Sequence, residues 1–392
     1  MKKIIFIFLM ASGSLFAQKK QKMSVLIDQQ FHFAAEQYGV LKHNIASGEM
    51  PRTFNPATGK VVTSDTKWWC SGFYPGSLLY IYEYTKNPDI KAEAEKRLAI
   101  LEKEKHYLGN HDLGFMMYCS FGNAYRLFHK AEDKATIDTS AMSLATRYRP
   151  SIESIQSWDS NELLKCPVII DNMMNLEMLC WVSDNGGDKR FKEIAINHAN
   201  TTLKTHFRAD NSSYHLVDYD LKTGQIIKKI TWQGLADSSA WARGQGWGLY
   251  GYTMMYRFTK DKNYLNQARK IAAFLINHPN LPADKIPYWD YNAPNTPTQY
   301  RDASAGALIA SALLELGQYT GAKEKKLYVN TAETMLRSLA SDKYRAKLGE
   351  NGGFLLLHSV GHMPNKTEID VPLTYADYYY LEALLRYKKW YL

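Results

Sequence analysis

The chain has 392 residues, a formal net charge of +9 at pH 7, and 13% aromatic residues. The positive charge weakly favours an anionic partner. Lysine and arginine do not gather in blocks and no nucleic-acid motif occurs, so nothing in the sequence supports DNA or RNA as that partner. The chain has only 4 cysteines, which are too few for a disulfide scaffold.

The first 17 residues have the layout of a secretory signal peptide. A pair of lysines precedes the apolar run Ile4–Met10, and Ala17 is a small residue at the expected cleavage point. The apolar run is too short to span a bilayer as a helix, and no later run of about 18 apolar residues occurs. We therefore expect a signal peptide at 1–17, one domain at 18–392, export to the periplasm or the medium, and no membrane attachment after cleavage.

The remaining sequence alternates between two kinds of helical segment. Amphipathic segments, in which apolar residues recur at helical spacing as Leu265, Ala268, Ala272 and Leu275 do, fall near residues 24–46, 88–107, 134–149, 189–206, 262–276 and 323–341. The other segments are apolar on every side, as buried helices are, and begin near Cys70, Asp112, Asp171, Ser239, Asp302 and Thr374.

Six amphipathic helices that alternate with six buried ones predict an all-α fold, an (α/α)6 barrel with an inner and an outer ring. Short connections make consecutive helices antiparallel, so all six inner helices run in the same direction and their N-termini meet at one mouth. Strand patterns are sparse. We expect one small β-hairpin in a loop, formed by Tyr214–Tyr219 and Gln225–Trp232 around the turn at Lys222–Gly224.

The predicted barrel brings polar and aromatic side chains from distant parts of the sequence to this mouth. They are Trp68, Trp69, His111, Asp112, Asp171, Asn172, Trp241, Arg243, Trp247, Arg301, Asp302, Tyr375 and Asp377, with His215, Trp232 and Gln233 from the long loop before the fourth inner helix. Aromatic plates stack on sugar rings and arginine pairs with carboxylates, so the mouth suits an acidic sugar.

Most of these residues also have a purely structural interpretation. A single aspartate at a helix start is more often an N-cap, Arg243 is as well explained as a buried ion-pair partner, and Asp302 as a partner for Arg301. Two acids on adjacent inner helices favour chemistry, because neighbouring helix axes lie about 8–10 Å apart. We therefore expect Asp112 and Asp171 to form a carboxylate pair with a raised pKa, as a general acid requires.

Motifs for other chemistries are missing from the sequence. It contains no phosphate-binding loop, dinucleotide glycine pattern, H-E-x-x-H, C-x-x-C or G-x-S-x-G. We expect neither a metal nor an organic cofactor.

Several of the segments resemble the unsaturated glucuronyl hydrolases of glycoside hydrolase family 88. The matching stretches are HDLGF (111–115), DNMMNLEML (171–179), SSAWARGQGWGLYGY (238–252), RDASAGALIASALLEL (301–316), NGGFLLLHSVGH (351–362) and DYYYLEALLR (377–386). The resemblance implies an (α/α)6 barrel. It also implies hydrolysis of the 4,5-unsaturated uronic acid that a polysaccharide lyase leaves at a non-reducing end. An acid protonates C4, water adds at C5, and the resulting hemiketal opens and releases the neighbouring sugar.

The resemblance also implies roles for individual residues. Asp171 corresponds to the general acid that then helps to deprotonate water, and Asp112 to its partner. Substrate contacts are implied for Trp69, His111, His215, Gln233, Arg243 and Trp247, with Trp158 as a further aromatic contact. One departure concerns a Ser-x-x-Ser-x-Lys pattern that binds a substrate sulfate in some family members. Here His362 replaces the second serine and the lysine is displaced to Lys366, which argues against a 6-sulfated galactosamine.

The sequence leaves three other functions open. A sister enzyme that acts on unsaturated galacturonyl-rhamnose from pectin has the same barrel and chemistry. A non-catalytic glycan-binding barrel and a lyase on the same fold are the other two. Glycosaminoglycan fragments, an anionic oligosaccharide substrate, remain the first expectation, and we expect a monomer or a weak homodimer.

Overall fold

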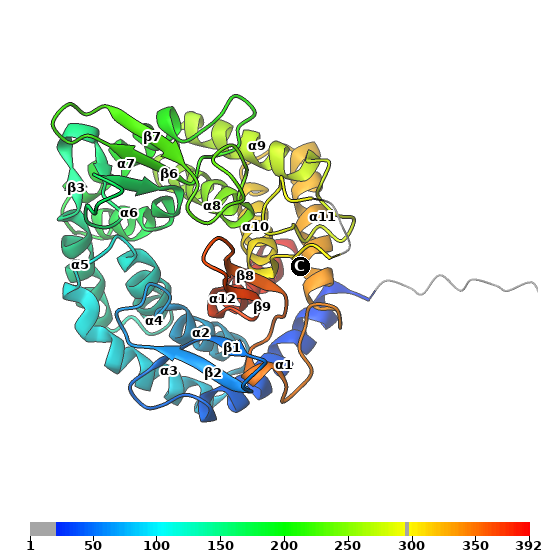
Figure 1. The fold of residues 1–392 in the computed structure, drawn as a ribbon. Coiled ribbons are helices and arrows are strands. Elements are labelled where there is room, and N and C mark those ends of the chain that lie inside the picture. The colour runs from blue at the N-terminus through cyan, green and yellow to red at the C-terminus, as the bar shows by residue number, and fades with distance from the viewer. Residues whose placement is uncertain (1–20, 295–297) are drawn as a thin grey trace, which may run out of the picture.

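The computed structural model describes residues 21–294 and 298–392, so the expected signal peptide lies outside the described residues. The described part is built mainly from helices, which form two concentric rings (Figure 1). The predicted (α/α)6 barrel is therefore confirmed.

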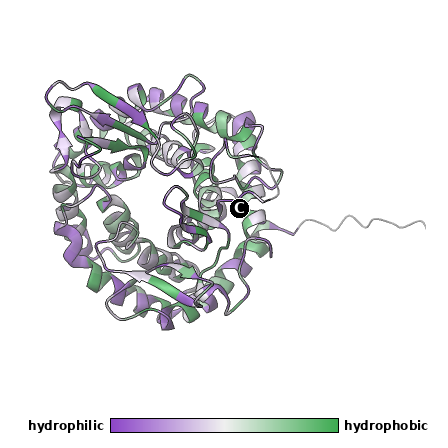
Figure 2. Cartoon of the chain, in the orientation of Figure 1, coloured by the Kyte–Doolittle hydropathy of each residue, from purple (hydrophilic) through white to green (hydrophobic). Residues whose placement is uncertain are grey.

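The outer ring consists of the amphipathic helices. In α9, Tyr264, Ala268, Ile271 and Leu275 are buried, while Leu265 is half-buried at the edge of the apolar stripe. Figure 2 shows hydrophilic stretches along the rim of the ring, as the outward faces of such helices require. The six outer helices are α1 (Met23–His43), α3 (Pro88–Leu101), α5 (Ala131–Ala145), α7 (Arg190–Thr205), α9 (Lys262–Asn277) and α11 (Ala322–Leu339).

The inner ring consists of the segments that are apolar on every side. All of α10 is buried, because it packs between α8, α12 and the outer helix α11. The ring closes where the last inner helix, α12, packs on the first, α2. In chain order the inner ring is α2 (Phe73–Thr85), η2 with α4 (Gly114–Gly122, Asn123–Phe128), η4 with α6 (Ile170–Met174, Leu176–Asp184), α8 (Ala242–Thr259), α10 (Ala303–Leu316) and α12 (Thr374–Tyr391).

The second and third inner helices are irregular at their N-terminal ends. The second begins as a π-helix, η2, and the third as a 3₁₀-helix, η4. Asp112 immediately precedes η2 and Asp171 lies in η4. Departures from α-helical geometry often occur at functional sites, so these two segments stand out within the inner ring.

Small β-sheets and short helices cover the loops between the rings. The expected hairpin exists as β6 and β7, and β5 adds a third strand through the pairing of Val168 with Val217. The other sheets are two-stranded pairs, β1–β2, β3–β4 and β8–β9. The strands are β1 (Met50–Asn55), β2 (Lys60–Ser64), β3 (Tyr148–Arg149), β4 (Ser154–Ile155), β5 (Pro167–Ile169), β6 (Leu216–Tyr219), β7 (Ile226–Ile230), β8 (Ser359–His362) and β9 (Thr367–Val371); the short helices are η1 (Glu102–His106), η3 (Pro150–Ile152) and η5 (Asn351–Gly353).

The described helices include no candidate membrane span, and the described side chains form no cluster suited to a metal ion. None of them combines the length and the apolar character that crossing a bilayer requires. Within residues 21–294 and 298–392, His, Cys, Asp and Glu side chains do not cluster in a group of three or more that is suited to a metal ion.

Candidate active site

Asp112 and Asp171 do not cap the helices at whose starts they lie. The first turns of η2 and η4 carry no side-chain cap, and the free N–H of Phe115 is instead bound by Asn175 Oδ1 at 3.1 Å. Asp302 behaves differently, since its carboxylate accepts the N–H groups of Ser304 and Ala305 at the start of α10. The capping interpretation is therefore correct for Asp302 and wrong for the carboxylate pair.

Asp171 faces a histidine whose orientation is fixed. His215 Nε2 lies 3.5 Å from Asp171 Oδ2, and both side chains are largely buried. The other ring nitrogen, Nδ1, accepts the backbone N–H groups of Trp232 and Gln233, each at 3.1 Å. Because Nδ1 is an acceptor, the neutral ring carries its proton on Nε2, the atom that faces Asp171.

The groups around Asp112 have opposite effects on its pKa. Burial raises the pKa of Asp112, the nearby His111 and the Asn175 side chain lower it, and the negative charge of Asp171 raises it further. His111 Nε2 is 3.3 Å from Asp112 Oδ1. Burial is the largest cause of the raised pKa of Asp112, and the contribution of Asp171 shows that the two carboxylates lie close enough to affect each other.

Arg243 fastens the site instead of pointing freely into it. Its Nη1 donates to Asp302 Oδ2 at 3.1 Å and to the carbonyl of Val360 at 2.6 Å. Its Nη2 donates to Gln233 Oε1 at 2.9 Å and to the carbonyl of Gly361 at 2.8 Å. Asp302 thus pairs with Arg243, whereas Arg301 pairs with Asp284 at 3.0 Å, so the interpretation of Asp302 as a partner for Arg301 is wrong.

The hairpin β8–β9 is held over the barrel mouth by these bonds. In Figure 1 it lies over the centre of the ring, beside α12. Its half-buried His362 has a pKa lowered to about 4, first by burial and then by the nearby His215 and Arg243 side chains. The hairpin therefore brings His362 into the same site as the carboxylates. Lys366 lies in the exposed turn of the hairpin.

Aromatic rings form the floor of the site. Trp69 contacts Phe115 with ring centroids 5.5 Å apart and Tyr375 at 4.9 Å. Trp247 is 1% exposed and also packs on Phe115, with ring centroids 5.0 Å apart. Trp69 is partly exposed and can stack on a ligand, whereas Trp247 supports the floor from beneath. Trp158 pairs with Trp232 at 5.8 Å, beside the loop that holds His215.

Two residues of the site were given no role from the sequence. Asn175 lies one helical turn after Asp171, and its side chain lowers the pKa of Asp112. Gly114 allows this close approach, because a Cβ there would come within 2.5 Å of the Asn175 backbone. The i, i+4 spacing of the acid and the amide in DNMMN was the available signal. His362 appeared in the sequence only as a departure from a sulfate pattern, because its approach to His215 depends on the folded hairpin.

Comparisons with known proteins point to one family. The model of Glycosyl Hydrolase Family 88 matches residues 44–391. An unsaturated glucuronyl hydrolase of Formosa agariphila is 43% identical over 88% of this chain and 86% of its own length. An unsaturated chondroitin disaccharide hydrolase of Streptococcus pyogenes serotype M1 is 35% identical over 86% of both chains.

Solved structures give the same assignment. An unsaturated glucuronyl hydrolase specific for heparin is 44% identical, with a TM-score of 0.90 over 93% of this chain and 98% of the other. A variant of the Streptococcus agalactiae enzyme, complexed with dGlcA-GalNAc6S, is 30% identical with a TM-score of 0.79, over 93% of this chain and 92% of the other.

The chain belongs to glycosyl hydrolase family 88. It is therefore a glycoside hydrolase, and the resemblance noted from HDLGF and DNMMN is confirmed. This family 88 protein places its two candidate carboxylates, two histidines and an aromatic floor at the mouth where the inner helices begin.

Proposed function

We propose that this enzyme removes the 4,5-unsaturated uronic acid from the non-reducing end of glycosaminoglycan fragments made by lyases. The observation that carries the proposal is the carboxylate pair: neither acid is used as a helix cap, and each faces a histidine. Relatives named unsaturated glucuronyl hydrolase and unsaturated chondroitin disaccharide hydrolase support the same chemistry.

In the proposed reaction, Asp171 donates a proton to C4 of the C4=C5 enol ether. The positive charge that develops at C5 and the ring oxygen is met by a water molecule, and Asp171, now a carboxylate, takes a proton from that water. The product is a hemiketal at C5, which opens to a ketone and releases the neighbouring sugar. One residue thus acts as acid and then as base, which requires a fixed position more than an extreme pKa.

The surrounding residues are proposed to hold charge and geometry around Asp171. Because its pKa is raised, Asp112 can take up a proton and so limit the negative charge beside Asp171. Its partner His111 fixes its position. The Nε2–H of His215 orients Asp171. Gln233 gives its oxygen to Arg243, so its amide nitrogen remains available to donate to a substrate oxygen.

The remaining substrate contacts are proposed from the same arrangement. Trp69 offers a partly exposed ring, and Trp247 supports the floor on which the unsaturated ring lies. Both Nη groups of Arg243 are already bonded within the protein. Arg243 therefore attracts the uronate carboxylate mainly by its positive charge at a distance and not by a direct hydrogen bond.

Heparin-type disaccharides are the proposed substrate class. The relative specific for heparin is 44% identical, and the relative complexed with a 6-sulfated galactosamine disaccharide is 30% identical. The hairpin position that would carry the second serine of the sulfate pattern holds His362, which is half-buried beside His215 and Arg243. The chain lacks the Ser-x-x-Ser-x-Lys pattern, but its net positive charge still suits a sulfated sugar.

We further propose that residues 18–392 form one catalytic domain, exported behind the leader at 1–17 to the periplasm or the medium. The basis is the leader's sequence pattern, with a lysine pair, the apolar run Ile4–Met10 and Ala17. A monomer or weak homodimer is the proposed assembly.

The test is the ultraviolet absorbance of the conjugated C4=C5 bond. The purified enzyme is mixed with lyase-generated disaccharides of heparin, chondroitin, hyaluronan and pectin type. A fall in absorbance on the glycosaminoglycan disaccharides is expected, fastest on the heparin type. A fall on pectin fragments alone would identify the sister activity, and a rise on intact polysaccharide would identify a lyase. No change with any substrate would favour a glycan-binding barrel.

A further inference from the structure

A cavity opens at the far mouth of the barrel. This far-mouth cavity has a volume of about 440 Å³ and is lined mainly by the C-terminal halves of inner helices. The carboxylate pair lies at the N-terminal ends of the same helices, so the two sites occupy opposite ends of the barrel. Phe115 lies between them, since it packs on Trp69 and Trp247 of the active-site floor and also lines the far-mouth cavity.

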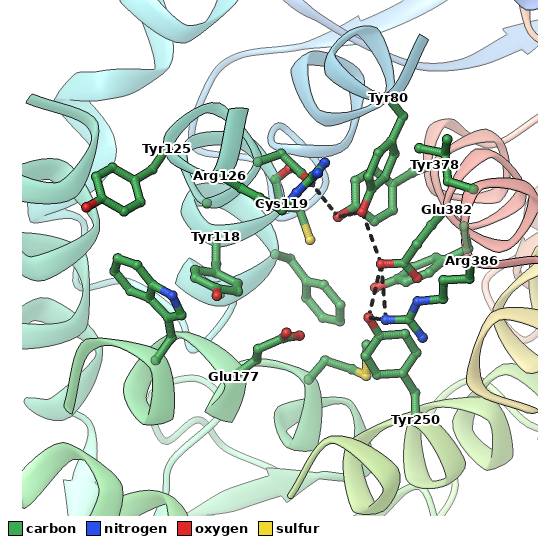
Figure 3. Close-up of a pocket in the computed structure, with 18 of the residues that line it drawn as sticks. Tyr80, Tyr118, Cys119, Tyr125, Arg126, Glu177, Tyr250, Tyr378, Glu382 and Arg386 are labelled. Carbon is green, nitrogen blue, oxygen red and sulfur yellow. Dashed lines mark hydrogen bonds and ion pairs between the residues drawn. The ribbon is translucent and has the colours of Figure 1, made fainter. Parts of the chain in front are cut away.

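One wall of the far-mouth cavity is a closed network of hydrogen bonds (Figure 3). Glu382 Oε1 accepts the hydroxyls of Tyr80 and Tyr250, each at 3.1 Å. Arg386 donates to the Tyr250 hydroxyl at 2.6 Å and lies 3.5 Å from Glu382. Because these groups satisfy one another, this wall is a fixed polar surface with little left to offer a charged ligand.

The charges that line the far-mouth cavity are compensated within the protein. Each lining arginine and lysine has a carboxylate partner, which leaves no excess of positive charge to attract an anion. Arg126 and Lys389 share Glu83, each at 2.6 Å, Arg257 pairs with Glu177 at 2.8 Å, and Arg386 pairs with Glu315 at 3.1 Å. Glu382, 3.5 Å from Arg386, is the fourth carboxylate, so it balances the remaining positive charge.

The opposite wall carries polar atoms that are still free. Glu177 binds Arg257 through Oε1, and within the described residues neither Glu177 Oε2 nor the Tyr118 hydroxyl has a hydrogen-bond partner. Figure 3 places Tyr118, Tyr125 and Glu177 together on this side, away from the closed network. Burial raises the pKa of Tyr118 well above its ordinary value, so its hydroxyl keeps its proton and can donate.

Aromatic faces lie beside these free polar atoms. The rings of Tyr125 and Trp181 meet edge to face, with centroids 5.4 Å apart. Trp181 also contacts Tyr118 at 5.9 Å. Aromatic faces next to a free hydroxyl and a free carboxylate oxygen are the groups that bind an uncharged polyhydroxylated ring.

We propose that the far-mouth cavity is a second binding site, for a neutral sugar of one or two rings. The sugar lies against Trp181 and Tyr125, and its hydroxyls bond to Tyr118 and to the free oxygen of Glu177. The volume of about 440 Å³ falls within the range of small-ligand pockets, roughly 300–1,000 Å³. This site is independent of the hydrolytic reaction proposed above.

The test is calorimetric titration of the full chain with N-acetylglucosamine and glucose as neutral probes, and with glucuronate and spermidine as charged ones. The neutral probes are expected to bind. Tyr118→Phe should weaken that binding about three- to ten-fold, since it removes one hydrogen bond, and Trp181→Leu should weaken it about ten-fold. Tyr256→Phe is the matched control, because its hydroxyl lies outside the cavity on α8.

The outcomes separate this site from the active site. Binding that survives Asp171→Asn but weakens in Tyr118→Phe supports the proposal. Loss of binding in Asp171→Asn, with no effect of Tyr118→Phe, would place the sugar at the carboxylates and overturn it. Binding of glucuronate or spermidine alone, or no binding to folded protein at tens of millimolar, would also overturn it. Circular dichroism confirms that the variants are folded.

Discussion

His215 Nε2 lies 3.5 Å from Asp171 Oδ2, while the loop N–H groups of Trp232 and Gln233 hold the opposite edge of the same ring. The loop between β7 and α8 therefore fixes the orientation of His215 relative to Asp171, the candidate general acid. The backbone N–H groups of this loop therefore act on the proposed proton transfer by Asp171 through the His215 ring. Substitutions of Asp171 and of His215 test the two ends of this contact.

Asp171→Asn is expected to reduce turnover by about three orders of magnitude or more while leaving the fold intact. The amide has the size of the carboxylate but cannot donate a proton to C4 or take one from water. The rate is measured from loss of the C4=C5 absorbance, and the fold from thermal unfolding. Asp159→Asn is the control, because that carboxylate is largely exposed on the loop before β5. Near-normal turnover in Asp171→Asn would refute the assignment of the acid.

His215 is expected to act as a positioning residue, which two variants distinguish. His215→Asn keeps a side-chain acceptor near the N–H groups of the loop but loses the group beside Asp171. His215→Gln restores a polar group near the Nε2 position. We expect kcat to fall about 10- to 100-fold in His215→Asn and less in His215→Gln, with little change in KM, because the variant loses an electrostatic contact with a carboxylate that lies 3.5 Å away.

The control for His215 is a histidine with a structural role. His198 lies on outer helix α7, its Nδ1 accepts the N–H of Ile155, and burial lowers its pKa to about 3. His198→Asn should lower thermal stability and leave kcat unchanged. If His215→Asn behaves in the same way, the ring only supports the loop and has no part in orienting Asp171.

The two rings of helices were predictable from the sequence because their signal is local. The apolar stripe of α9 and the fully apolar run of α10 each specify burial within a few turns of chain. The β6–β7 hairpin was predictable for the same reason. Strand β5 was not, because its pairing with β6 joins Val168 to Val217 across the intervening helices α6 and α7.

The sequence predicted which residues lie together at the candidate site better than it predicted their hydrogen-bond partners. The shared direction of the inner helices placed Asp112, Asp171 and Arg243 at one mouth. The partners of Arg243 include the carbonyls of Val360 and Gly361, which are more than 100 residues away along the chain. Backbone carbonyls carry no sequence signature, so the sequence identified a cation at the mouth and could not show that its Nη groups were already occupied.

Asp112→Asn is expected to have opposite effects on activity and stability. If the two carboxylates act as a unit, turnover should fall by several orders of magnitude. The folded pKa of Asp112 is raised by burial above its ordinary value of 3.8, so the wild type loses stability as the pH rises from that value through the folded pKa. The asparagine variant has no such loss. Its melting temperature relative to wild type should therefore increase with pH.

The control for this pH dependence has the opposite sign. Asp220 lies in the exposed turn between β6 and β7, and the backbone N–H groups of Thr223 and Lys222 lower its pKa. Its contribution to stability is present above its unfolded pKa and is lost as the pH falls, so Asp220→Asn should lose stability most at neutral pH. Thermal unfolding from pH 4 to 8 measures both variants. A lower melting temperature of Asp112→Asn at every pH would restore the capping interpretation.

Arg243→Met is expected to destabilise the fold by about 3–5 kcal/mol, because it leaves Asp302 buried without its partner and frees two carbonyls of β8. Arg243→Lys should recover only part of the loss, since one ammonium group cannot reproduce the two-sided guanidinium bonding. Denaturant unfolding gives the free energy, and hydrogen exchange in 359–371 reports whether the β8–β9 hairpin loosens. Arg52→Met is the matched control, because Arg52 anchors the same hairpin through the partly exposed Glu368 at 2.8 Å, and such a pair contributes about 1 kcal/mol or less. Unchanged stability in Arg243→Met, with a large rise in KM, would show instead that Arg243 acts directly on the substrate carboxylate.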